Sequence, residues 1–235
     1  MAVTINGDGT IGGISVGGLP DGVVDSGTLA TGIDATKLAD GTITNSELQY
    51  INSLSSNAQT QISAAGGAWT VISSQTASAS ADISFTSIGS YESYCLIYSD
   101  TYPATTSVHL VFRVSHSGTF QTGNYYTATD ATSSSGGIVA GSGWTSGIGI
   151  NPISQVIVNT ANIGQAGVLF LHNVANGSNF HMSGHGMGYT TGPVYTRWTI
   201  GGSHGSATNV DGFRLYYNAG NIATGTFTLY GISNA

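Results

Sequence analysis

The sequence predicts a mainly β protein. We expect an antiparallel β-sandwich head, jelly-roll-like in type, preceded by a short coiled-coil helix and an extended, repeat-containing N-terminal stalk. Three observations support this: apolar residues recur with period two after Trp69, a heptad pattern occupies residues 44–62, and a short repeat opens the chain. We therefore divide the chain into residues 1–43, 44–64 and 67–235.

The first segment contains an irregular repeat built on Asp-Gly pairs, which mark turns. Val24, Ile33 and Ile43 are each followed by Leu five positions later. One such unit buries very little apolar surface, so the repeat predicts that several chains wrap together around a narrow shared core. A flexible Gly-rich linker with accidental similarity is the alternative.

The second segment begins as a helix. Thr44 and Glu47 have the spacing of a capping box, in which each side chain satisfies a backbone donor at a helix start. The apolar and small residues that follow in steps of three and four form a heptad seam: Leu48, Ile51, Ser55, Ala58 and Ile62. Because so short a helix is unstable alone, we expect a clasp between identical chains. The alternative is one amphipathic helix packed on a domain.

The third segment reads as an all-β domain. Short runs rich in Val, Ile, Thr, Tyr and Phe are bounded by Gly, Ser or Asn. The predicted strands are residues 69–75, 81–88, 94–99, 107–115, 155–159, 167–174, 194–200, 212–217 and 224–230. Alternation places Val108, Leu110, Phe112 and Val114 on one face, and likewise Phe213, Leu215 and Tyr217. Strands without intervening helices favour an antiparallel sandwich.

The composition excludes several classes of function. The 235 residues include only four basic side chains, which are scattered, and the net charge is −7, so we expect no nucleic-acid binding. No apolar run approaches the roughly 20 residues of a membrane span, so we expect no membrane insertion. Cys95 is the only cysteine and is expected to be a small buried hydrophobe. With no export signal at the N-terminus, the chain is expected to fold in a cytoplasm and to work outside it.

Three stretches resemble a known family. Residues 14–22 and 43–54 are similar to the shaft of tail fibres from tailed phages, especially phages of cyanobacteria and marine bacteria, and residues 225–232 resemble the last strand of their β-sandwich heads. The resemblance implies a homotrimer in the virion tail, held together at the heptad seam. Its N-terminus would attach to tail or baseplate proteins, and its head would contact a host-surface glycan or protein. A structural virion protein, such as a capsid decoration or baseplate component, is the alternative.

Catalysis is not expected. A glycan-degrading tailspike, the weaker alternative, needs paired carboxylates. The acids of the head are few: Asp82, Glu92, Asp100, Asp130 and Asp211. Asp82 and Glu92 lie at predicted strand edges, and Asp211 lies in a predicted turn before Gly212, so a structural role is expected. Neither a nucleophile-elbow motif on a strand-to-helix turn nor a phosphate-binding loop is present. We predict no catalytic residues, no metal and no cofactor.

Adhesion is the function that remains, and two Gly-rich regions have the composition for it. Residues 123–144 and 185–192 are expected to be loops that offer aromatic faces and hydrogen-bonding groups to a receptor. The candidate receptor-binding residues are Tyr125, Tyr126, Trp144, His185 and Tyr189. A core or interface role is the alternative for Tyr125, Tyr126 and Trp144. His181 is expected to point outward from a strand that a mobile loop follows, and a metal held between chains by one histidine from each is the weaker alternative.

Overall fold

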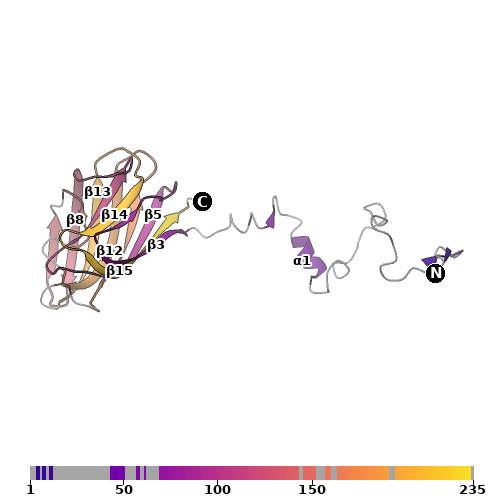
Figure 1. The fold of residues 1–235 in the computed structure, drawn as a ribbon, viewed down its shortest axis with the longest axis horizontal. Helices are drawn as coiled ribbons and strands as arrows, with labels where there is room; N and C mark the ends of the chain where they lie inside the picture. The colour runs from indigo at the N-terminus through magenta and orange to yellow at the C-terminus, as the bar shows by residue number, and fades with distance from the viewer. Residues whose placement is uncertain are drawn as a thin grey trace. The chain divides into compact units, whose positions relative to one another are not determined.

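A computed structural model describes residues 4–5, 7–8, 11–12, 43–50, 57–58, 61, 69–142, 145–151, 157–159, 163–190 and 194–233. The chain divides into two compact units, Met1–Ala65 and Gly66–Ala235. Figure 1 shows the second unit as a layered β domain. We call Gly66–Ala235 the head unit.

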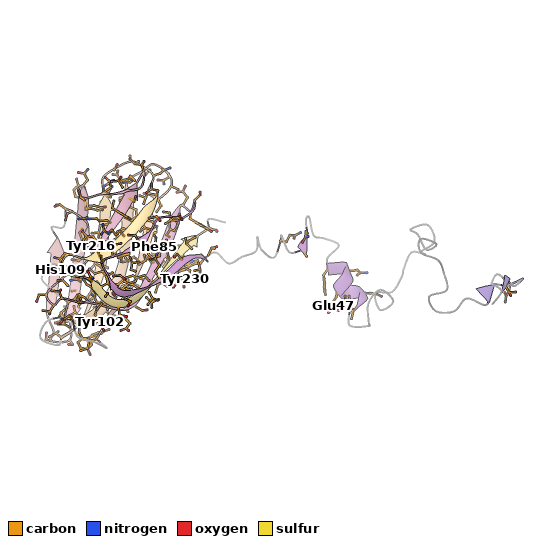
Figure 2. The ribbon with its side chains drawn as sticks, in the orientation of Figure 1. Glu47, Phe85, Tyr102, His109, Tyr216 and Tyr230 are labelled. Atoms are coloured by element: carbon orange, nitrogen blue, oxygen red, sulfur yellow. The ribbon has the colours of Figure 1, made fainter. Side chains whose placement is uncertain are left out.

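The described part of the first unit contains one short sheet, helix α1 and two further helical residues, Ala58 and Gln61. Strand β1 (Thr4–Ile5) pairs antiparallel with β2 (Ile11–Gly12), and helix α1 spans Asn45–Tyr50. The capping box is confirmed: the Thr44 amide donates to Glu47 Oε2 at 2.8 Å, and the Glu47 amide donates to Thr44 Oγ1 at 3.2 Å. The bond from the Thr44 amide, and then a bond at 2.7 Å in which the Thr44 hydroxyl donates to the same Glu47 Oε2, hold the pKa of the Glu47 carboxyl, labelled in Figure 2, below its ordinary value.

The predicted heptad seam is only partly within the described residues. Leu48 lies in α1, and Ala58 is an exposed helical residue. Ile51, Ser55 and Ile62 lie outside the described residues, as does most of the repeat in residues 1–43. The coiled coil and the stalk therefore stay predictions.

The head unit is built from two antiparallel sheets over its described residues. The larger, eight-stranded sheet has the order β3-β15-β5-β11-β12-β13-β8-β9, and the smaller has the order β10-β6-β14-β4, with β7 paired to β6. The strands of the larger sheet are β3 (Trp69–Ser80), β5 (Ser93–Pro103), β8 (Tyr125–Ser133), β9 (Ile138–Ser142), β11 (Gln165–His172), β12 (Phe180–Thr190), β13 (Val194–His204) and β15 (Ile222–Ile232). Those of the smaller sheet are β4 (Ile83–Phe85), β6 (Leu110–His116), β7 (Thr119–Phe120), β10 (Ile148–Gly149) and β14 (Gly212–Tyr217).

One hydrophobic core joins the two sheets. Phe112 on β6 stacks on Phe180 on β12, with ring centroids 5.8 Å apart, and Phe213 on β14 packs edge-on against Tyr94 on β5 at 5.4 Å. All four side chains are fully buried. Burying an aromatic side chain contributes roughly 1.5–3 kcal/mol, so these contacts between sheets are a main source of stability. Packing of this kind is consistent with a β-sandwich.

Most of the predicted strands are confirmed. Residues 212–217 coincide with β14, and the predicted inward faces are correct, because Leu110, Phe112, Phe213 and Leu215 are all fully buried. Seven further predictions overlap β3, β4, β5, β6, β11, β13 and β15. Of residues 155–159, only 157–159 are described, and Ile157 forms isolated bridges with Val108 and Thr190.

The prediction of two loops, at residues 123–144 and 185–192, was wrong over much of their length. Residues 125–133 form β8, and residues 185–190 belong to β12 rather than to a mobile loop. In β8 the inward positions are partly threonines, and in β12 they are partly glycines, so neither strand shows the usual apolar alternation. Gly186 is required on the inner side because a Cβ there would lie 2.5 Å from Trp198 Nε1.

Candidate functional site

The outer face of the eight-stranded sheet, turned away from the smaller sheet, divides into two halves of different chemistry. Over β8, β12 and β13 the outward side chains are mostly polar and exposed, and we call this the polar half. Over β3, β15, β5 and β11 the outward side chains are mostly apolar or carry Ser and Thr hydroxyls, and Trp69, Val71 and Ile97 are large, apolar and exposed; we call this the apolar half. The polar half carries the depressions described next.

A depression of about 370 Å³ lies across the polar half. Its floor is the backbone of one register row, Gly186–Trp198–Ala131. Its walls are the exposed side chains of the two neighbouring rows: His185, Thr199 and Asp130 on one side, and Met187, Arg197 and Thr132 on the other. Standard strand geometry gives walls about 7 Å apart and about 10 Å long, so we call this depression the groove.

Arg197 gives the groove a positive charge and forms no ion pair within 4 Å with any described group. The two other arginines of the head unit have structural partners. Arg113 donates to the Ser146 carbonyl and lies over the Tyr216 ring, and Arg214 forms an ion pair with Asp82 at 2.7 Å. Within the described residues, Arg197 forms no ion pair. Its five donors are therefore available to a ligand carrying oxygen atoms.

Asp130 and His185 supply complementary chemistry on the opposite wall. Both side chains are exposed and belong to the same register row, through Thr199 between them. A carboxylate accepts hydrogen bonds from hydroxyl groups, while a neutral imidazole can donate one and accept one. The groove thus combines donors and acceptors on both sides, as a polyhydroxylated ligand requires.

Aromatic side chains lie at both ends of the polar half. Tyr189 and Tyr195 pair across β12 and β13 with ring centroids 5.7 Å apart, and the Tyr195 hydroxyl donates to Met187 Sδ at 3.0 Å. At the other end, Tyr126 and His181 line a second, shallower depression. From Ser203, which pairs with Tyr126, to Tyr195 is eight residues along β13, or about 26 Å.

The structure sorts the predicted receptor-binding residues into three groups. Tyr126, His185 and Tyr189 all point outward on the polar half, and Tyr126 is 68% exposed. Tyr125 is corrected to a core residue: it is 2% exposed, and its hydroxyl accepts from the Val114 amide at 2.9 Å, which connects β8 to the smaller sheet. Trp144 lies outside the described residues.

Asp130, Arg197 and Tyr195 were missed as site residues. Asp130 was weighed only as a catalytic acid, and Arg197 only as a scattered basic residue. The signal that could have found them is alternation. Once residues 180–190 are read as a strand, Gly184, Gly186 and Gly188 mark one face and His185 and Met187 the other.

Two further titratable side chains of the head unit, Cys95 and His181, have the positions that the sequence predicts. Cys95 is fully buried, as predicted, and burial raises the pKa of its thiol to about 11. His181 is exposed, which confirms its predicted outward orientation. Among the described residues, no group of three His, Cys, Asp or Glu side chains could hold a metal ion.

No protein-family model, curated protein or solved structure matches the chain. Within the described part of the chain, no helix has the length and apolar character to cross a membrane.

Proposed function

We propose that this chain is a homotrimeric phage tail fibre that attaches to the virion tail through its N-terminal segment and adheres to a host-surface glycan through the polar half of its head unit. The observation that carries the proposal is the groove, with unpaired Arg197 facing Asp130 and His185 beside the Tyr189–Tyr195 pair. Donors, acceptors and aromatic faces together suit a ligand made of hydroxyl groups and C–H faces.

The resemblance of residues 14–22, 43–54 and 225–232 to tail-fibre shafts and heads supports the location in the virion. The jelly-roll-like head, the coiled coil and the stalk belong to the same proposal. Three copies on one shaft would turn weak individual sites into strong adhesion, because the second and third binding events become intramolecular.

Adhesion without catalysis fits the way in which the acids of the head unit are used. Asp82 forms an ion pair with Arg214, and Asp211 accepts a hydrogen bond from the Gly118 amide at 2.7 Å. Asp130 stands in the groove opposite Arg197 rather than opposite a second carboxylate. We therefore assign Asp130 to ligand binding.

The test is binding of the full chain to an array of bacterial surface polysaccharides and to whole bacterial cells. We expect binding by the wild type and a loss of at least about tenfold for Arg197→Gln, because a hydrogen bond to a charged group contributes roughly 1.5–3 kcal/mol and each 1.4 kcal/mol is a factor of about ten in affinity. Thr226→Ala, at an exposed position on the outer face of β15, is the matched control and should bind like the wild type.

Binding to assembled capsids or baseplates alone, with none to cells or polysaccharides, would support the structural virion protein instead. Release of soluble sugar from a bound polysaccharide would overturn the assignment of a non-enzymatic function.

A further inference from the structure

The apolar half carries a cluster of large side chains that the head unit leaves partly uncovered. Trp69 is 45% exposed, Val71 is 58% exposed and Ile97 is 39% exposed. The Trp69 ring lies 6.1 Å from the ring of Phe170 and 5.9 Å from that of Tyr230, centroid to centroid. We call these five residues the apolar patch; Figure 2 labels Tyr230 within it.

The register places four residues of the apolar patch, Val71, Tyr230, Phe170 and Ile97, in two neighbouring rows of one sheet face. Val71, Tyr230, Cys95 and Phe170 are successive partners across β3, β15, β5 and β11, and the next row contains Ser74, Thr228, Ile97 and Val168. Directly paired residues of antiparallel strands point to the same side of a sheet. Neither row contains an acidic or basic residue. The two rows are therefore uncharged across four strands, and their hydroxyl groups, on Ser74 and Thr228, hydrogen-bond to each other at 2.9 Å.

We infer that the apolar patch is the surface through which the head units of three copies of this chain pack against one another around a common axis. This inference rests on the proposed homotrimer. The chemistry fits an identical partner, because neither row of the patch carries a charge and two such faces can meet without like-charge repulsion. Interfaces between identical subunits are also the more apolar class.

The position of Trp69 in the chain favours the same partner. Trp69 begins β3, the first strand of the head unit, and lies only seven residues after Ile62, the last residue of the proposed seam. Seven extended residues span at most about 25 Å. Chains that are joined at the seam therefore hold their patches close together, at a high effective concentration.

Cysteine cross-linking of the full chain tests the inference. We compare Val71→Cys in the patch with Ala128→Cys, an exposed outward position on β8 in the polar half. The reagent is a short bismaleimide at low micromolar protein, and the wild type, whose one cysteine is buried, gives the background. We expect covalent dimers from V71C at several times the yield from A128C, and an added Ile97→Asp change should reduce the V71C yield severalfold.

Equal yields from V71C and A128C, or no product above the wild-type background from V71C, would overturn the inference. A monomeric full chain, or a patch covered by residues 1–65 of its own chain, would also leave V71C without cross-links and so contradict it. Arg197→Gln should leave the cross-linking unchanged. Loss of glycan binding with intact cross-linking would therefore count against the proposed function and not against the patch.

Discussion

The two halves of the outer sheet face differ in the kind of side chain that they expose. In the apolar half, Trp69, Val71 and Ile97 expose hydrocarbon that only another apolar surface can cover. In the polar half, Arg197, Asp130 and His185 expose hydrogen-bonding groups around a groove. Both halves share the same core beneath them, so the difference lies in their outward side chains, and we attribute it to the different partners proposed above. One half is suited to a second copy of the chain and the other to a hydroxylated ligand.

The largest expected change in the free energy of unfolding comes from truncating a core residue that lies beneath the polar half. Phe180 on β12 stacks on Phe112 and packs against Phe213 of the smaller sheet. Phe180→Ala should lower the free energy of unfolding by about 3–5 kcal/mol, because it deletes a buried aromatic ring and leaves a cavity. Denaturant unfolding measures it. A loss below about 1 kcal/mol would contradict the packing of the two sheets on one core.

The next largest loss of stability compares a substitution on the inner side of β12 with one on the outer side of β13. Gly186→Ala adds a methyl group against Trp198 on the inner side, and we expect a loss of about 1–3 kcal/mol from overpacking. Gly201→Ala is the matched control, since its Cβ would lie outward and 3.8 Å from the Ala128 carbonyl oxygen. Equal losses in thermal or denaturant unfolding would mean that the assigned inner and outer sides of these strands are wrong.

A smaller effect, on the pH dependence of stability, distinguishes an inward histidine from an outward one. His204 on β13 is 2% exposed, and its Nδ1 lies 3.3 Å from Nε2 of His116 on β6. Burial, and then the neighbouring His116, lowers the pKa of His204. His204 therefore binds a proton more readily in the unfolded chain than in the folded one. Below the unfolded pKa of about 6.5, protonation favours the unfolded chain, so stability that is present above this pH is lost as the pH falls.

Melting temperatures between pH 7.5 and pH 5 measure this dependence. His204→Gln should flatten the fall in melting temperature, whereas His181→Gln, at an exposed position of the polar half, should leave it unchanged. An identical pH profile for the wild type and His204→Gln would rule out the assigned contribution of His204.

The smallest effect is on stability at the groove itself. Arg197→Gln should change the free energy of unfolding by no more than about 0.5 kcal/mol, because the side chain is exposed and forms no ion pair within the described residues. A larger loss in denaturant unfolding would show that Arg197 supports the fold rather than a ligand.

The sequence was sufficient for the β class and for strands whose inward residues are apolar, such as residues 212–217. It was insufficient where inward positions hold small or polar residues. Thr127 and Thr129 on β8, and Gly186 on β12, point inward, yet Thr and Gly are also common in loops, so the sequence alone did not identify these strands. The choice between Tyr125 and Tyr126 also required the structure, because adjacent strand residues point to opposite faces and only the register decides which is buried.

Hydroxyl-radical footprinting of the full chain tests the contrast between the two halves most directly. Trp69 and Met187 are 45% and 43% exposed in the single chain, so they form a matched pair across the two halves. With each residue normalised to the unfolded protein, we predict strong protection of Trp69 and little protection of Met187 in the absence of any ligand. Equal protection of the two residues would contradict the assignment of the apolar half to a second copy of the chain.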